Sequence, residues 1–120
     1  MSGEVNLPPA IQERLLRLQQ LQQTLQAVLT QKQQIEAELV EFDQSLSELE
    51  KATDDSVIYK SVGSLLIKTE RTKVIGELKE KKEMSDMRVS VLGKQEERLR
   101  TQVKEVQEKL QSDLRPLSPP

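Results

Sequence analysis

The stretch VIYKSVGSLLIKT, residues 57–69, decides the fold because its composition differs from that of everything around it. Valine, isoleucine, tyrosine and leucine cluster there, whereas the flanking segments are rich in glutamine, glutamate, leucine and lysine. β-Branched and aromatic residues favour strands, and the pair Gly63-Ser64 suits a two-residue hairpin turn. We therefore expect a β-hairpin with strands near residues 57–62 and 65–69.

The segment before the hairpin, residues 10–52, spaces its apolar residues by the alternating steps of four and three that are typical of a coiled coil. From Leu21 onward the spacing is regular, with Lys32 as its one polar position. The steps from Leu15 to Leu18 and from Leu18 to Leu21 are both three, which predicts a local overwinding of the supercoil. The predicted seam consists of Ile11, Leu15, Leu18, Leu21, Leu25, Val28, Ile35, Leu39, Phe42, Leu46 and Leu49.

The segment after the hairpin, residues 72–114, repeats the spacing with more interruptions. Three positions of its seam are polar, and Gly76 and Gly93 each cost a helix interior about 1 kcal/mol. The predicted seam consists of Ile75, Leu78, Lys82, Ser85, Val89, Leu92, Glu96, Leu99, Val103, Val106 and Leu110.

A minor apolar stripe of Met84, Met87 and Val91 lies off the seam of this second helix. It either packs locally near the hairpin or forms an adaptable interaction surface, since methionine fits many partners.

These elements predict a mainly α fold, a long antiparallel two-helix coiled coil with one central β-hairpin. The chain length of 120 residues allows one domain at most. The expected organisation is a flexible lead (1–9), a single domain (10–114, with helix 10–52, hairpin 57–69 and helix 72–114) and a flexible tail (115–120).

The hairpin is also the expected assembly surface. A lone two-stranded hairpin is marginal in water, and its two edges carry unpaired backbone groups. We expect apolar side chains on both faces: Val57, Tyr59, Leu65 and Ile67 on one, and Ile58, Val62 and Leu66 on the other. The hairpin is therefore predicted to pair with hairpins of other chains in a β-barrel between subunits. The alternative is that it folds down onto its own helices.

Composition excludes several classes of function. Charged residues make up 32% of the chain but the net charge is −2, which gives no electrostatic reason to bind nucleic acid or an anionic membrane. The sequence has no cysteine and no histidine, so thiol chemistry and the usual zinc ligands are excluded. No apolar run is long enough to span a bilayer and no signal peptide is visible, so we expect a cytoplasmic protein.

No enzyme motif is present either. The four glycines are scattered rather than gathered in a phosphate-binding loop. The paired carboxylates Asp54-Asp55 lie in a turn after the first helix, where they are better read as a helix terminator than as a metal site. We expect no catalytic residue, no metal and no cofactor.

The segment from Ile58 to Thr69, set between two coiled-coil helices, resembles the β-class prefoldin subunits. The lead Pro8-Pro9, the run Gln31-Lys32-Gln33 and the run Gln95-Glu96-Glu97-Arg98 are similar too, so the resemblance covers essentially the whole chain. The α class has a longer middle with two hairpins, whereas the short segment here fits only one.

The resemblance implies an ATP-independent chaperone subunit. Such subunits form hexamers, in archaea of two α-class and four β-class chains, in which hairpins build a double β-barrel. The tips of the coiled coils hold unfolded polypeptides and deliver them to a group II chaperonin. The implied assembly hairpin consists of Val57, Ile58, Tyr59, Val62, Gly63, Leu65, Leu66 and Ile67.

The tip is the end of the coiled coil where the first helix begins and the second ends. If the helices fray there, seam residues face water and form a small apolar patch on each tip. Each of the six tips of the hexamer then binds a client weakly, and together they bind it avidly. The expected client-binding residues are Val5, Leu7, Ile11, Leu15, Leu110, Leu114 and Leu117. The alternative for Ile11, Leu15 and Leu110 is that they close the last layer of the seam.

Two other functions compete with this one. A structural tether that dimerises through its hairpin would have the same elements but would not suppress aggregation of a denatured protein. A nucleic-acid-binding zipper needs a basic region, and residues 1–12 contain no lysine or arginine.

Overall fold

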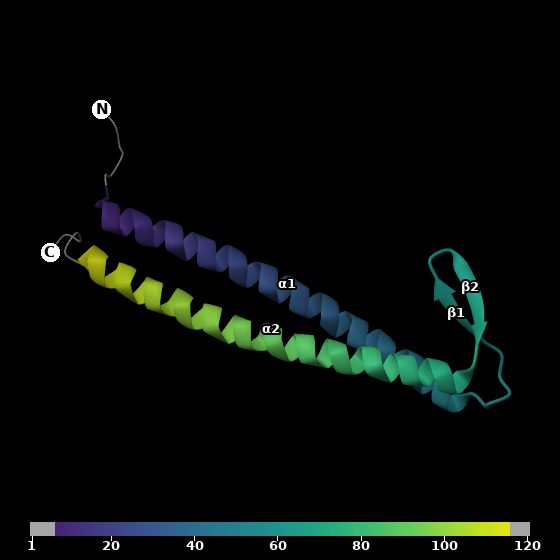
Figure 1. Ribbon diagram of the computed structural model, residues 1–120. Helices are drawn as coiled ribbons and strands as arrows, with labels where there is room; N and C mark the ends of the chain where they lie inside the picture. Colours follow the sequence, from purple (N-terminus) through teal and green to yellow (C-terminus); the bar gives the residue numbers. More distant parts are fainter. Residues whose placement is uncertain (1–6, 116–120) are drawn as a thin grey trace. The chain divides into compact units, whose positions relative to one another are not determined.

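Two long helices joined by a β-hairpin make up the computed structural model of the chain, which describes residues 7–115 (Figure 1). Their bounds are α1 (Pro9–Lys51), β1 (Ile58–Val62), β2 (Leu65–Thr69) and α2 (Arg71–Leu114). The predicted fold class is confirmed. Helix α1 begins and ends one residue earlier than the sequence suggested, and α2 begins one residue earlier. Neither helix carries an apolar stretch that could cross a membrane, within residues 7–115.

The chain divides into two compact units, and each helix contributes to both. In the described residues, the terminal unit comprises residues 7–31 and 92–115, and the hairpin unit comprises residues 32–91. In the terminal unit the first part of α1 runs antiparallel to the last part of α2, because Arg14 near the start of α1 pairs with Asp113 near the end of α2. In the hairpin unit Asp43 of α1 pairs with Lys82 of α2.

The start of α1 is fixed by its two prolines. The carbonyl oxygen of Pro8 accepts hydrogen bonds from the backbone N–H groups of Ile11 and Gln12, at 3.0 and 3.1 Å. Pro9 is the first helical residue, a position at which its missing N–H costs nothing. The Gln12 side chain then donates to the carbonyl oxygen of Leu7 at 2.6 Å, which holds Leu7 against the first turn.

The seam of the terminal unit differs from the predicted one at a single position. Arg14, and not Leu15, is the half-buried residue between Ile11 and Leu18, whereas Leu15 is 42% exposed. With Arg14 included, the steps alternate regularly between three and four, so the predicted overwinding was wrong. An arginine is tolerated in the seam because its aliphatic stem covers apolar surface while its guanidinium group pairs with Asp113.

The seam of the hairpin unit follows the prediction, polar positions included. Lys32 and Lys82 are half-buried, and Ser85 is only 6% exposed. Ile35 and Leu49 are the buried apolar residues of α1 in this unit. A seam this narrow leaves most of each helix surface in water.

The hairpin has a two-residue loop, and this settles which side chains share a face. Val62 faces Leu65 and Tyr59 faces Lys68, so each odd-numbered residue lies opposite an even-numbered one. Because facing residues of antiparallel strands point to the same side, the predicted grouping of odd with odd residues was wrong. One face carries Ile58, Lys60, Val62, Leu65, Ile67 and Thr69, and the other carries Tyr59, Ser61, Leu66 and Lys68.

The turn itself depends on Gly63, which has a positive φ of 58°. Ser64 does not share this conformation, and a positive φ at the first central residue alone defines a type II′ turn. Glycine adopts this conformation without steric cost, and type II′ turns match the twist of the strands on either side.

The end of α1 is tied to the start of α2. Thr53 and Ser56 close a turn directly after α1, with Ser56 N–H donating to the Thr53 carbonyl oxygen at 3.0 Å. Arg71 donates from Nε to the Leu49 carbonyl oxygen at 2.6 Å and from its guanidinium group to Asp54 at 3.1 Å. Asp54 therefore has a structural partner, in keeping with its interpretation as part of a helix terminator.

Candidate functional site

The hairpin presents most of its apolar side chains to solvent. Ile58, at its base, is half-buried. The other apolar residues predicted for assembly are between 46% and 72% exposed, namely Val57, Tyr59, Val62, Leu65, Leu66 and Ile67. In the described residues the sheet has two strands, so the backbone groups along both of its outer edges have no strand partner. Unpaired strand edges together with exposed apolar side chains are typical of an interaction surface.

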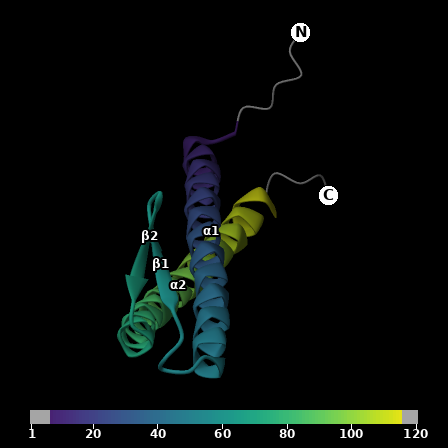
Figure 2. The same ribbon diagram turned by 90° about the vertical axis from the view of Figure 1, so that its right-hand side faces the viewer.

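One ion pair anchors the hairpin to α2. Lys60 of β1 donates to a carboxylate oxygen of Glu77 at 2.9 Å, and both views show the hairpin standing beside the start of α2 (Figures 1 and 2). The hydrogen bond from Lys60 lowers the pKa of Glu77 below its ordinary value of 4.5. The hairpin face that carries Lys60 is therefore the one that turns toward α2, while the Tyr59 and Leu66 face turns away from it.

The predicted tip residues divide into a closed layer and an exposed fringe. Ile11 and Leu110 are buried, at 4% and 6% exposure, and thus close the seam. Leu15 and Leu114 stay exposed, at 42% and 39%. Leu7 is half-buried. The remaining two predicted tip residues, Val5 and Leu117, lie outside the described residues.

Sequence reasoning missed three residues at this end of the terminal unit. Leu16, 55% exposed, adds to the apolar surface beside Leu15. Arg14 and Asp113 form the ion pair that crosses the seam next to the buried layer of Ile11 and Leu110. The signal for the pair was present in the sequence, because including Arg14 makes the steps of the first helix regular.

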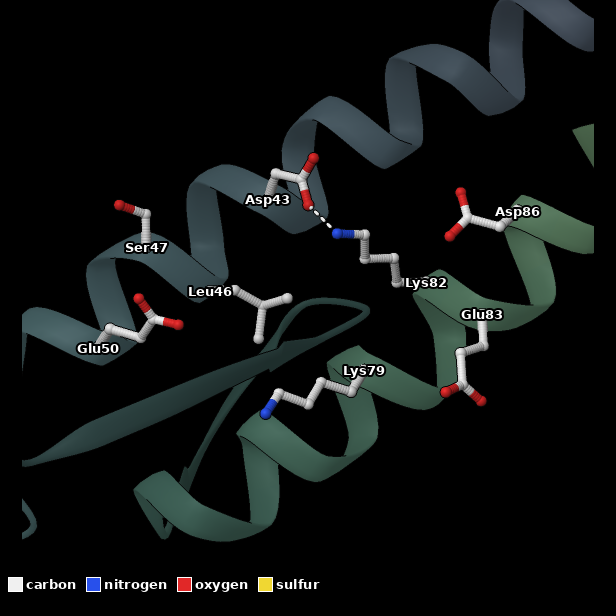
Figure 3. Close-up of a pocket in the computed structure, with 8 residues that line it drawn as sticks. All are labelled: Asp43, Leu46, Ser47, Glu50, Lys79, Lys82, Glu83 and Asp86. Carbon is white, nitrogen blue, oxygen red and sulfur yellow. Dashed lines mark ion pairs between the residues drawn. The ribbon is translucent and has the colours of Figure 1, made fainter.

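The hairpin unit also contains a groove of about 420 Å³ between α1 and α2 (Figure 3). Asp43 and Lys82 cross it as an ion pair at 2.7 Å, and the hydrogen bond from Lys82 to Asp43 raises the pKa of Lys82. The groove is lined by Asp43, Leu46, Ser47, Glu50, Lys79, Lys82, Glu83 and Asp86. Its charges of both signs partly neutralise one another. Over residues 7–115 no group of three or more acidic side chains is placed to hold a metal ion.

The comparisons with known proteins agree with the arrangement of helices and hairpin. A sequence profile of the family described as "Prefoldin subunit" matches residues 12–115. The prefoldin subunit beta of Pyrococcus furiosus is 46% identical over 111 residues, which cover 92% of this chain and 95% of the relative. That of Archaeoglobus fulgidus is 49% identical over 110 residues, which cover 92% and 95%. The crystal structure of the prefoldin beta subunit from Thermococcus strain KS-1 superposes with a TM-score of 0.83 at 43% identity and covers 96% of this chain and 98% of that one.

Prefoldin subunits are chaperones rather than enzymes, so the expectation of a non-catalytic protein agrees with the family. The family match extends over both helices and the hairpin and includes Ile58–Thr69, the segment that first suggested it, but it begins after Pro8-Pro9. The chain therefore belongs to the prefoldin family, and within that family to the β class.

Proposed function

We propose that this chain is one of four β-class subunits in a cytoplasmic hetero-hexamer with two α-class subunits. The hexamer captures unfolded polypeptides at the coiled-coil tips without ATP and delivers them to a group II chaperonin. The observation that carries this proposal is that exposed apolar side chains gather on the hairpin and again at the end of the terminal unit where α1 begins and α2 ends. Val40, Met84, Met87 and Val91 are exposed as well but lie at neither place.

The hairpin supports the assembly part of the proposal. Its two edges have no strand partner in the described residues, and Leu65 and Leu66 are 64% and 72% exposed. Pairing the edges with hairpins of neighbouring subunits satisfies the backbone groups, and closing the sheet into a barrel covers the apolar faces. Gly63 belongs to the assembly hairpin because it allows the tight turn that holds the two strands in register.

The end of the terminal unit supports the capture part. Leu15, Leu16 and Leu114 are exposed there although the helices that carry them are intact. A small apolar patch on one subunit binds an unfolded chain weakly and without sequence specificity. Several such patches on one assembly act on the same client at a high effective concentration and therefore bind it avidly. The adjoining Ile11 and Leu110 add to the patch only when the last layer of the seam opens.

Co-expression with an α-class subunit tests the proposal. We expect a complex with the mass of a hexamer that suppresses aggregation of a chemically denatured test protein without ATP. Adding a group II chaperonin with ATP should then raise the yield of refolded test protein. Removing residues 1–7 and 114–120 should reduce aggregation suppression without reducing the mass of the complex. A dimer that leaves aggregation unchanged would contradict the proposal and favour a structural tether.

A further inference from the structure

Arg71, the first residue of α2, carries a charge of the wrong sign for its own helix. The N-terminal end of a helix is the positive end of its dipole and favours acidic side chains, yet the first turn of α2 has none. At the other end of a helix the dipole is negative and the last carbonyl groups lack partners within the helix. Arg71 meets such an end, because its Nε donates to the carbonyl oxygen of Leu49 at 2.6 Å, two residues before α1 ends at Lys51. The position of this arginine is therefore explained by its contact with the other helix.

The same guanidinium group also holds the connection between α1 and the hairpin. Arg71 donates from a terminal nitrogen to Asp54 at 3.1 Å. Asp54 lies in the turn that Thr53 and Ser56 close, in which the Thr53 N–H donates to the Ser56 Oγ at 3.0 Å. The side chain of Arg71 is 21% exposed and that of Asp54 is 79% exposed, so the arginine is the more enclosed partner. We call the two bonds that Arg71 makes, to Leu49 and to Asp54, the base clamp.

The base clamp fixes both ends of the hairpin. The first strand begins at Ile58, four residues after Asp54, and the second strand ends at Thr69, two residues before Arg71. One bond therefore joins the segment that leads into the hairpin to the segment that leads out of it. The bond to Leu49 then ties this junction to the last turn of α1.

A fixed base is needed because the hairpin itself is weakly held. Most of its apolar side chains are exposed, so they contribute little packing against the helices. The ion pair of Lys60 with Glu77 also joins the hairpin to α2, but its side chains are 40% and 33% exposed, and ion pairs at such exposure contribute little. The more enclosed guanidinium group at the base, with two acceptors, is better placed to determine how the hairpin stands on the helices.

We propose that Arg71 is a positioning residue for assembly, which holds the hairpin in the orientation at which neighbouring subunits bind it. The inference rests on the proposed function, in which hairpins assemble the complex, and it identifies a side chain outside the hairpin on which that assembly depends. A hairpin that moves about its base presents its strand edges correctly for only part of the time. Apparent affinity falls by the same fraction, so a hairpin that is correctly oriented for about a tenth of the time binds roughly tenfold more weakly.

Tyr59 makes the mobility of the hairpin measurable. It lies on β1 and is the one tyrosine of a chain without tryptophan, so the fluorescence of the full-length chain comes from the hairpin. In Arg71→Ala the fluorescence anisotropy should fall, while circular dichroism shows the helices intact. The matched control is Arg100→Ala, which removes an ion pair to Glu96 at 2.9 Å within α2 and should keep the wild-type anisotropy. An unchanged anisotropy in Arg71→Ala would overturn the inference.

Assembly with an α-class subunit gives the second readout. The concentration at which the hexamer dissociates, measured by sedimentation, should rise on the order of tenfold for Arg71→Ala and stay unchanged for Arg100→Ala. Arg71→Lys should lie between wild type and Arg71→Ala, because a lysine offers one point of attachment where the guanidinium group offers a fork. Equal dissociation concentrations for Arg71→Ala and wild type would overturn the inference.

Asp54→Ala shows whether Arg71 acts through the base clamp. It should weaken assembly less than Arg71→Ala, because Arg71 keeps its bond to Leu49. In the Arg71→Ala background it should have no further effect, and an additive effect would overturn the role of the clamp. Asp54→Ala and Arg71→Lys also provide the test if Arg71→Ala fails to fold. A wild-type chain that forms no hexamer is a separate result, which overturns the proposed function, and the anisotropy of Tyr59 then decides whether Arg71 holds the hairpin.

Discussion

Arg14 of α1 and Asp113 of α2 face each other across the seam of the terminal unit and form an ion pair. The pair lies next to the buried layer of Ile11 and Leu110, at 4% and 6% exposure. Both charged side chains keep about a third of their surface in contact with water, with 37% and 28% exposure. The pair therefore fixes the antiparallel register of the helix ends more than it stabilises them.

Replacing the pair with leucines should stabilise the chain. Partly exposed ion pairs contribute about 0.2–1 kcal/mol, so Arg14→Ala should lower the free energy of unfolding by no more than that. Arg14→Leu with Asp113→Leu should raise it above the wild-type value, because two apolar side chains then fill the seam. Urea unfolding followed by circular dichroism measures both changes. A double-leucine variant less stable than wild type would show that the ion pair holds the register by more than its small net energy.

The seam rather than the outer faces should determine the stability of the hairpin unit. Ile35 is 4% exposed, so Ile35→Ala should lower the free energy of unfolding by about 2–4 kcal/mol through lost burial and the cavity left behind. Val40, five residues later on the same helix, is 56% exposed. Val40→Ala should therefore change the free energy of unfolding by less than about 0.5 kcal/mol. Urea titrations of the two variants provide the comparison. Equal losses would mean that Val40 is covered in solution.

Sequence periodicity predicted the helices, the hairpin and most of the seam, because these depend on local spacing. It failed at Arg14, where a search for apolar residues selected Leu15, although the regular steps of three and four pass through Arg14, whose charge is balanced by Asp113. It also failed for the hairpin faces. The two-residue loop was predicted correctly, but such a loop places odd-numbered residues opposite even-numbered ones, whereas the predicted faces grouped odd with odd. The same choice between two adjacent positions explains the tip residues, because Arg14 faces the other helix and Leu15 is therefore exposed, whereas Ile11 is buried.

Alanine should have opposite effects at the turn and in the helix. Gly63 has a φ of 58°, and an added Cβ would meet nothing within 4 Å. Gly63→Ala should therefore lower the free energy of unfolding by about 1–2 kcal/mol through backbone strain alone. Gly76 lies inside α2 with nothing within 4 Å, so Gly76→Ala should raise the free energy of unfolding by about 1 kcal/mol. Thermal unfolding measures both changes, as a lower midpoint for Gly63→Ala and a higher midpoint for Gly76→Ala. Gly63→Asn is the control for strain and should be milder than alanine, because asparagine tolerates positive φ better.

Acid should weaken the anchor of the hairpin before the helices unfold. The pKa of Glu77 is lowered by Lys60, so the folded chain binds fewer protons here than the unfolded chain does. The stability that this group contributes is complete above the ordinary value of 4.5 and is lost as the pH falls through the lower folded value. Glu77→Gln should therefore be less stable than wild type at neutral pH, and the difference should vanish in acid. The matched control is Glu105→Gln, at an exposed position with no ion pair in the described residues, which should behave as wild type.

The alkaline side should respond to a different pair. Asp43 raises the pKa of Lys82 above its ordinary value of 10.5, so the folded chain holds this proton more tightly than the unfolded chain. The stability from this group is present below 10.5 and is lost as the pH rises through the higher folded value. Asp43→Asn should remove the dependence of stability on alkaline pH that this pair causes. It should leave the dependence of stability on acidic pH unchanged. The measurement is the urea unfolding midpoint of both proteins across the alkaline pH range. The same loss of stability with rising pH in wild type and in Asp43→Asn would contradict the role of the pair.

Capture of clients should depend on the exposed leucines at the end of the terminal unit and not on its stability. Leu15 and Leu114 are 42% and 39% exposed, so Leu15→Ser with Leu114→Ser should reduce aggregation suppression by the complex while changing the unfolding midpoint little. Ile11→Ser should lower the midpoint clearly, because Ile11 is 4% exposed and a hydroxyl would be buried there. Its effect on capture should be positive or neutral at temperatures where the helices remain folded, since an opened layer exposes Leu110. Equal aggregation suppression by wild type and the double serine variant, with both complexes intact, would place client binding elsewhere on the subunit.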